Sequence, residues 1–320
     1  MPTTRAARRA ARCLTEVLPT DALGLVLYQL TLAHDIAAVA PTCHALCDAA
    51  KLALKLRPFS GEVVTLAGHT HWVVCVAAAP DGRVITGSHD NTVKVWRDGA
   101  CERTIQAHHG SVSAVAVLPG GARFVSGSLD RTAKLWTLDG ALERTFEVES
   151  EVYCVTALAD GVHFVVGIWE EVQLYHVDGT LVHTFKGHTS VVRAVAVTPD
   201  GQHIISGSWD KLVKVWSVAS KSLVSTCAGH TDRVFAVAAM PDGQRILSGG
   251  RDKTVRVWLL DGTLENTFRL HTNWVRALVA LPDNQHALSG SDDKTVKLFN
   301  ANDGAVLRTF KHHTSCMLSL

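Results

Sequence analysis

A segment of about forty residues repeats along most of this chain, and this period limits the possible folds more than any other feature. The string GHTSVVRAVAVTPDGQHIISGSWDKLVKVW, from Gly187 to Trp216, recurs as GHTDRVFAVAAMPDGQRILSGGRDKTVRVW, from Gly229 to Trp258. A period of this length is typical of one small structural unit that is stacked many times. The marker histidine of each copy, or the valine that replaces it once, recurs every 39 to 42 residues, at His69, His108, Val148, His188, His230, His271 and His313.

Within each copy, apolar residues run or alternate over short stretches between turn signals, which is strand behaviour rather than helix behaviour. Pro-Asp-Gly at 80–82, 199–201 and 241–243 supplies a first hairpin turn, in which glycine can adopt a positive φ. Asp-Gly at 98–99, 139–140, 178–179, 261–262 and 303–304 supplies a second turn. Four antiparallel strands in forty residues, with no helix between copies, form a blade, so we predict an all-β propeller.

Residues 62–320 resemble the WD-repeat family, through Gly-His near the start of a repeat and an acid followed six residues later by an aromatic residue, or five later in the third copy. We predict six complete four-stranded blades and a partial seventh. Residues 62–66 and those after His313 would share the partial blade, unless the ring closes on six. The acid and aromatic pairs are Asp90/Trp96, Asp130/Trp136, Glu170/Tyr175, Asp210/Trp216, Asp252/Trp258 and Asp293/Phe299.

Each typical repeat also holds a histidine, a hydroxyl residue and an aspartate, the three groups that activate a nucleophile in hydrolases. An active site would be built once, whereas this set recurs. We therefore predict a buried chain of hydrogen bonds from indole to hydroxyl to histidine to aspartate, and no enzyme. The predicted tetrads are His69, Thr86, Asp90 and Trp96; His108, Ser126, Asp130 and Trp136; His188, Ser206, Asp210 and Trp216; His230, Ser248, Asp252 and Trp258.

The third repeat departs from this pattern, because Val148 replaces the histidine, Val166 the hydroxyl residue, Glu170 the aspartate and Tyr175 the tryptophan. Buried polar partners must be paired or removed together, so the two valines fit a structural network that is absent from this repeat. We expect the third blade to be the least tightly specified of the six.

Residues 16–56 are rich in alanine and leucine, with apolar residues three and four apart, and are predicted to be helical. They follow a basic arm (1–15) and precede a linker (57–61). The strings LPTDALGLVLYQL and DIAAVAPTCHAL are similar to the F-box, although His44 and Leu46 depart from its pattern. The resemblance implies docking on a Skp-type adaptor, and the alternative is packing on the propeller. The predicted adaptor-binding residues are Leu18, Pro19, Leu23, Val26, Leu27, Leu30 and Ile36.

The propeller template places three residues of each blade around the central channel. Four of them are arginines, against the acids Glu151 and Asp292. Phosphopeptide-reading F-box proteins with propellers carry arginines at positions matched by Arg193, Arg251 and Arg276, so the resemblance implies an acidic or phosphorylated peptide; a solvated rim is the alternative. The predicted peptide-binding face consists of Trp72, Tyr153, Trp169, Arg193, Trp209, Arg233, Phe235, Arg251, Trp274 and Arg276.

Composition and motif content limit the classes of partner and cofactor that we expect. The 31 basic and 30 acidic side chains nearly cancel, so we expect no direct nucleic-acid binding, and the longest apolar run, Trp72 to Ala79, is too short to span a membrane. Eight cysteines without paired spacing favour reduced thiols in a cytoplasmic or nuclear protein. No phosphate loop or zinc motif is present, and Cys43, His44 and Cys47 lack a second ligand pair, so we expect neither cofactor nor metal.

Together these features predict a non-enzymatic scaffold that binds proteins or peptides. The more specific hypothesis is the substrate receptor of an SCF-type ubiquitin ligase, in which the helical segment joins adaptor and cullin while the propeller selects an acidic or phosphorylated target. The alternative is a general assembly platform for trafficking, RNA or chromatin complexes, with no ligase role.

Overall fold

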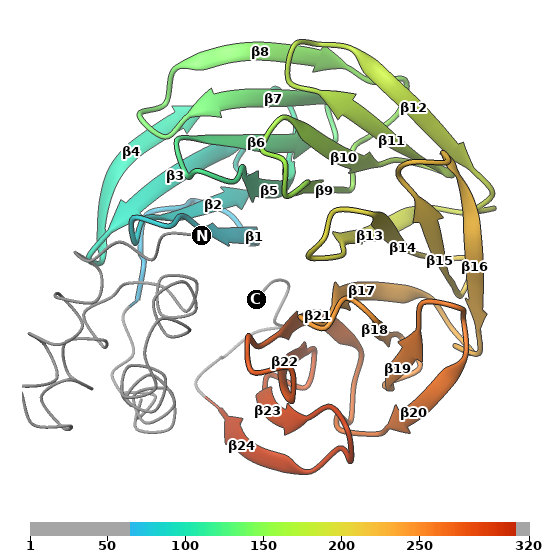
Figure 1. Ribbon diagram of the computed structural model, residues 1–320. Coiled ribbons are helices and arrows are strands. Elements are labelled where there is room, and N and C mark those ends of the chain that lie inside the picture. The colour runs from blue at the N-terminus through green and yellow to red at the C-terminus, as the bar shows by residue number, and fades with distance from the viewer. Residues whose placement is uncertain (1–64, 312–320) are drawn as a thin grey trace, which may run out of the picture. The chain divides into compact units, whose positions relative to one another are not determined.

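The computed structural model describes residues 65–311, and the regular secondary structure in this range consists of strands only (Figure 1). The strands form six sheets, each of four antiparallel strands that follow one another in chain order. The prediction of six complete four-stranded blades is confirmed. The predicted helical segment 16–56 lies outside the described range, as do residues 62–64 and 312–320 of the predicted seventh partial blade. Thr65 and Leu66, which the prediction assigns to the same partial blade, are described and belong to no strand. No helix of the described part is long and apolar enough to cross a membrane.

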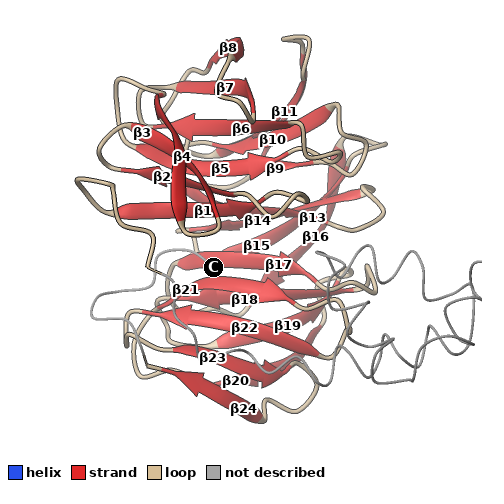
Figure 2. Ribbon diagram, turned by 90° about the vertical axis from the view of Figure 1, so that its left-hand side faces the viewer, coloured by secondary structure: helices blue, strands red, loops and turns tan. Residues whose placement is uncertain are grey.

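Each blade takes its four strands consecutively from the chain, and the first of them is the innermost (Figures 1 and 2). The strands of blades 1 to 3 are β1 (Val73–Ala78), β2 (Val84–Ser88), β3 (Thr92–Arg97), β4 (Ala100–Gln106), β5 (Val112–Val117), β6 (Arg123–Ser128), β7 (Thr132–Thr137), β8 (Leu142–Glu147), β9 (Cys154–Ala157), β10 (His163–Gly167), β11 (Glu171–His176) and β12 (Leu181–Lys186). Those of blades 4 to 6 are β13 (Val192–Val197), β14 (His203–Ser208), β15 (Leu212–Ser217), β16 (Ser222–Ala228), β17 (Val234–Ala239), β18 (Arg245–Gly250), β19 (Val255–Leu259), β20 (Leu264–Phe268), β21 (Val275–Ala280), β22 (His286–Ser291), β23 (Val296–Asn300) and β24 (Val306–Phe310).

The hydrophobic core lies between neighbouring sheets rather than inside any one of them. Val93 and Val95 of blade 1, for example, share a cluster with Phe124 and Trp136 of blade 2. A single four-stranded sheet cannot bury both of its faces, so each blade is stabilised by the blades beside it.

Neighbouring blades approach closely because a glycine on the second strand of one blade faces a valine of the next. A Cβ atom placed on Gly127 would lie 2.5 Å from Cγ1 of Val152, and one on Gly249 would lie 2.6 Å from Cγ1 of Val275. The absent side chain therefore makes the space that the valine fills. The valines at this position in blades 2 to 6 are fully buried: Val112, Val152, Val192, Val234 and Val275.

The series of blades has two ends. The innermost strands pack in the order β1, β5, β9, β13, β17, β21, and no packing of comparable extent joins β21 back to β1. Accordingly Val73, which occupies the valine position in blade 1, is 42% exposed. Whether the ring closes on six or seven blades depends on residues 62–64 and 312–320, which lie outside the described range.

Candidate binding face

The first repeated structure is the hydrogen-bonded tetrad of each typical blade. In blade 4 the indole Nε1 of Trp216 donates to Oγ of Ser206 at 2.8 Å, and Ser206 lies 2.8 Å from Nε2 of His188. Nδ1 of His188 lies 2.7 Å from Oδ2 of Asp210. If Nδ1 of His188 donates to Asp210 and the hydroxyl of Ser206 donates to Nε2, every polar group of the tetrad has a partner.

The same chain of contacts recurs in the other three repeats for which a tetrad was predicted. The three distances of each chain lie between 2.7 and 3.0 Å in blade 1 (His69, Thr86, Asp90, Trp96), blade 2 (His108, Ser126, Asp130, Trp136) and blade 5 (His230, Ser248, Asp252, Trp258). The histidine, hydroxyl and aspartate of each set are therefore engaged within their own blade, which is the arrangement that a structural role requires.

The aspartate of each tetrad also holds two stretches of backbone. Asp210 accepts hydrogen bonds from the backbone nitrogens of Thr189 and Leu212, at 3.1 and 2.9 Å. It thereby ties the segment before the innermost strand to the turn between the second and third strands. A threonine two residues after the aspartate adds a further bond in blades 1, 2, 5 and 6, which sequence reasoning missed although the pattern Asp-x-Thr was visible; the threonines are Thr92, Thr132, Thr254 and Thr295.

Blades 3 and 6 show what remains when members of the tetrad change. In blade 6, His271 still contacts Ser289 and Asp293, both at 2.8 Å, but the aromatic position holds a phenylalanine, which cannot donate. In blade 3 the predicted loss of the tetrad is accompanied by a different pair: the hydroxyl of Tyr175 donates to Oε1 of the buried Gln173 at 2.9 Å. Blade 3 thus satisfies its buried hydroxyl with one local bond.

Burial and hydrogen bonding within the tetrads shift the pKa values of their histidine and aspartate side chains. Burial is the main reason that the pKa of His108 falls to about 4, because desolvation disfavours the charged imidazolium more than the neighbouring Asp130 favours it. Burial opposes ionisation of Asp252 as well, but hydrogen bonds from His230, Thr254 and the backbone of Thr231 outweigh it and hold the pKa of this carboxyl well below its usual range.

Acidification should therefore destabilise the propeller at a pH at which the tetrad aspartates, whose pKa values are lowered, are still ionised. Below its ordinary pKa of 6.5, His108 binds a proton in the unfolded chain but stays neutral in the folded one, so stability falls as pH drops from 6.5 toward 4. Between pH 7.5 and 5 the share due to His108 should be about 2 kcal/mol. Urea unfolding at several pH values measures it, with His108→Gln, which cannot titrate, as the matched control. An equal pH slope in both proteins would contradict this assignment.

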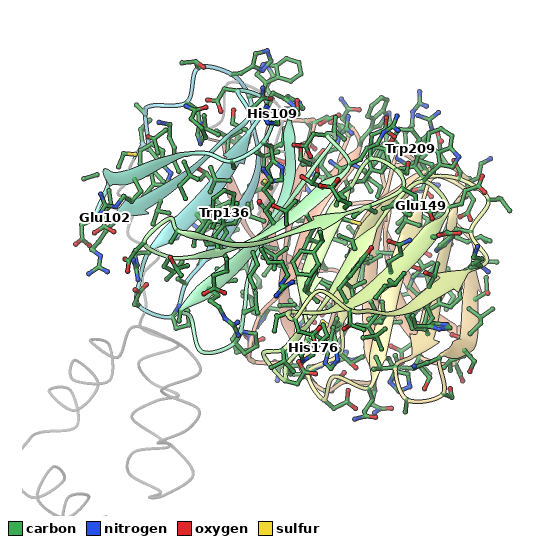
Figure 3. The ribbon with its side chains drawn as sticks, turned by 90° about the horizontal axis from the view of Figure 1, so that it is seen from above. Glu102, His109, Trp136, Glu149, His176 and Trp209 are labelled. Atoms are coloured by element: carbon green, nitrogen blue, oxygen red, sulfur yellow. The ribbon has the colours of Figure 1, made fainter. Side chains whose placement is uncertain are left out.

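The second repeated structure is a face built from the segment before each innermost strand and the turn between the second and third strands. A backbone hydrogen bond joins the two: Arg251 N donates to Arg233 O at 2.8 Å, and Trp209 N donates to Val191 O at 2.9 Å. Figure 3 shows Trp209 on the same face as His109 and Glu149, with His176 on the opposite face. The eight tryptophans divide between the tetrads and this face, which holds Trp72, Trp169, Trp209 and Trp274.

Arginine and aromatic side chains alternate across blades 4 to 6. The guanidinium carbon of Arg233 lies 4.4 Å from the ring centre of Trp209. That of Arg276 lies 4.4 Å from the ring centre of Phe235 and 4.7 Å from that of Trp274, which Arg251 also approaches, at 4.5 Å. We call these six side chains the arginine–aromatic stack: Trp209, Arg233, Phe235, Arg251, Trp274 and Arg276. Cation–π contacts of this kind fix long side chains in one arrangement.

Two arginines of the stack already have a carboxylate partner. Asp292 receives Nε and Nη2 of Arg276 at 3.0 and 2.9 Å, a bidentate pair. Arg251 lies 3.6 Å from Asp232, and both of these side chains are more than a third exposed. The predicted phosphate site of Arg193, Arg251 and Arg276 therefore holds only one arginine with no carboxylate within 4 Å among the described residues.

That arginine is Arg193, which lines a cavity of about 170 Å³ in the channel between the innermost strands. Arg276, Phe235 and Tyr153 line the same cavity. Nη1 of Arg193 donates to the backbone oxygen of Tyr153 at 3.3 Å. Burial, with a contribution from the nearby charge of Arg276, lowers the pKa of this guanidinium, although the thiols of Cys154 and Cys75 act in the opposite direction. A half-buried guanidinium whose only hydrogen bond among the described residues goes to a carbonyl is suited to receive an anion.

The remaining predicted face residues lie apart from the stack. Trp72 is 68% exposed and groups with His71 and His89 of its own blade, while Trp169 of blade 3 is 52% exposed. The predicted adaptor-binding residues and the Cys43, His44 and Cys47 cluster lie outside the described range. Among residues 65–311, no group of three or more acidic, histidine or cysteine side chains is arranged to hold a metal ion.

Consecutive four-stranded blades, most of them held together by a hydrogen-bonded tetrad at the same position, define a repeat propeller. The profile of the WD domain, G-beta repeat family (WD40) matches residues 60–97, 99–137, 179–217, 221–258 and 262–300, which together make up more than half of the chain. The chain therefore belongs to the WD-repeat family. The longest interval between these matches, residues 138–178, contains the first three strands of blade 3, whose tetrad is absent.

Individual relatives match shorter stretches. The chain is 45% identical over 60 residues to the small ribosomal subunit protein RACK1y of Oryza sativa subsp. japonica, covering 17% of this chain and 18% of that protein. It is 40% identical over 55 residues to the phospholipase A-2-activating protein of Xenopus laevis and 47% identical over 55 residues to protein DOA1 of Saccharomyces cerevisiae; each match covers 17% of this chain, and 7% and 8% of the respective relatives. The chain thus spans less than a fifth of the length of these curated relatives.

Proposed function

We propose that this WD-repeat chain is an interaction scaffold whose face binds an acidic or phosphorylated segment of a partner protein. The observation that carries the proposal is Arg193, a guanidinium in the channel cavity with no carboxylate within 4 Å among the described residues. Arginine offers a planar fork of donors, and its attraction to an anion is stronger where water is excluded.

The arginine–aromatic stack supports a peptide as the ligand. Its planar side chains present wide contact area, and their mutual contacts hold them in place before a ligand arrives, so little conformational entropy is lost on binding. The exposed Trp72 and Trp169 lie on blades 1 and 3 and could contact residues that flank the anionic group. An extended peptide that crosses the channel mouth satisfies all of these features.

The test is a fluorescence titration of peptide libraries that carry a fixed phosphoserine, aspartate or serine. We expect phosphoserine or aspartate libraries to bind and the serine library to bind poorly. Arg193→Gln should weaken the tightest peptides by about tenfold or more, since a charge-assisted hydrogen bond contributes about 1.5–3 kcal/mol. Arg83→Gln, on the turn between β1 and β2, is the matched control. The proposal would be contradicted if peptide affinity depended neither on the anionic residue of the peptide nor on Arg193.

A role as substrate receptor of an SCF-type ubiquitin ligase would extend this function. It rests on the resemblance of residues 16–56 to the F-box and, like the cytoplasmic or nuclear location, stays a prediction. If this segment docks through apolar residues, Leu18→Glu with Pro19→Ala should abolish co-purification of a Skp-type adaptor and a cullin while peptide binding by the propeller persists. Without adaptor capture by the wild type, the alternative of a general WD-repeat assembly platform is favoured.

A further inference from the structure

We propose that Asp292 and Asp232 are internal competitors of the anionic ligand: they occupy Arg276 and Arg251, leave Arg193 as the main anion contact, and thereby set the affinity of the face. This inference rests on the proposed function and adds to it a pair of residues that regulate the site. It reverses the sequence-based expectation that Arg251 and Arg276 would hold the ligand.

The strongest support is the geometry of Asp292. Its two carboxylate oxygens receive Arg276 in the bidentate arrangement that a ligand carboxylate or phosphate would adopt. The side chain of Asp292 is 8% exposed and that of Arg276 is 23% exposed, so the pair is poorly screened by solvent. The rings of Phe235 and Trp274 contact the same guanidinium and hold it in position for Asp292.

A ligand anion gains little binding free energy by replacing Asp292 as the partner of Arg276. It would exchange one charge-assisted pair for another and leave a second carboxylate, poorly solvated, beside the ligand's own charge. An anion that binds Arg193 does not have to displace a carboxylate, because the only hydrogen-bond partner of this guanidinium among the described residues is a backbone oxygen. Arg193 and Arg276 line one cavity, so we expect that neutralising Asp292 would let both of them contact a single anion.

The second pair is looser and should act more weakly. Nε of Arg251 is 3.6 Å from Asp232, and their side chains are 38% and 40% exposed, so water already competes for the contact. Asp232 also accepts a hydrogen bond from the backbone nitrogen of Arg233 at 2.8 Å, which engages part of its carboxylate. The structure therefore predicts a graded effect, larger for Asp292 than for Asp232.

The experiment titrates the full chain, as the wild type and as variants, with the phosphoserine and aspartate libraries described above. Asp292→Asn should tighten binding by about tenfold and Asp232→Asn by about twofold. Glu170→Gln makes the same change of charge in the corresponding turn of blade 3 and should leave binding nearly unchanged. Adding Arg276→Gln to Asp292→Asn should remove the gain, because the freed guanidinium is then absent.

The outcomes separate the two ideas. If the wild type binds through Arg193 but Asp292→Asn gains no more than Glu170→Gln, or keeps its gain without Arg276, the competitor role is wrong while the proposed function stands. If no library binds the wild type or any variant, both are wrong. Asparagine preserves the shape of Asp292, and Asp292→Ser with an unfolding measurement provides a second variant, so that a loss of folding is recognised.

Discussion

Asp210→Ala should lower the free energy of unfolding by about 3 kcal/mol or more, whereas Glu170→Ala in blade 3 should change it by less than about 0.5 kcal/mol. Removing the Asp210 carboxylate takes the acceptor from His188 and from the backbone nitrogens of Thr189 and Leu212. Each buried donor without a partner costs about 1–3 kcal/mol. Glu170 is exposed, and its blade has valines where His188 and Ser206 stand in blade 4.

Urea unfolding of both variants measures the difference, with Asp210→Asn as an intermediate case. Asparagine keeps one acceptor oxygen, which can replace either Oδ1, the acceptor of Leu212 N, or Oδ2, the acceptor of Thr189 N and His188, but not both, so its loss should fall between the other two. Because blades are stabilised by their neighbours, fluorescence of the eight tryptophans should be followed together with circular dichroism to reveal unfolding of part of the propeller. Equal midpoints for Asp210→Ala and Glu170→Ala would contradict the structural role of the tetrad.

The fold could be predicted because its main determinants are local and repeated. Turn glycines, alternating apolar residues and the marker histidine each recur in register, so several copies support the same interpretation. The partners within a tetrad lie at fixed offsets, such as the 18 residues between His188 and Ser206, and the repeat itself reveals those offsets. The structure adds contacts that sequence reasoning missed, among them the bond between Tyr175 and Gln173 in the divergent blade, which no other repeat could reveal.

The candidate binding face was harder to predict because the contacts of its side chains extend from one blade to the next. The template placed Arg276 and Asp292 near the channel, but it contained no information that their side chains would pair. The stacking of Arg276 on Phe235 of the preceding blade likewise depends on how side chains extend across an interface. Charge counts therefore overstated the number of arginines without a carboxylate partner, because Arg251 and Arg276 are paired with Asp232 and Asp292. Arg193 and Arg233 have no carboxylate within 4 Å among the described residues, and only Arg193 of these two lines the channel cavity.

Gly249→Ala should lower the free energy of unfolding by about 2–3 kcal/mol, although it adds a single methyl group. The new Cβ would lie 2.6 Å from Cγ1 of Val275 and 3.1 Å from Cδ1 of Leu278. Val275 is fully buried in the neighbouring blade, so its side chain has no free space to enter. The methyl group must therefore push blades 5 and 6 apart, which loses contacts along the whole interface.

A double-mutant cycle distinguishes this clash from a general cost of altering the strand. Val275→Ala alone should cost about 2 kcal/mol by leaving a cavity, but it removes Cγ1, the nearest of the atoms that the new Cβ of Gly249→Ala would meet. The two changes together should then cost at least about 1 kcal/mol less than the sum of the single costs, as expected for residues in direct contact. Additive losses would mean that the spacing between blades is not set by the pairing of glycine with valine. In that case the full burial of the valine in blades 2 to 6 would have to arise from the curvature of the sheets instead.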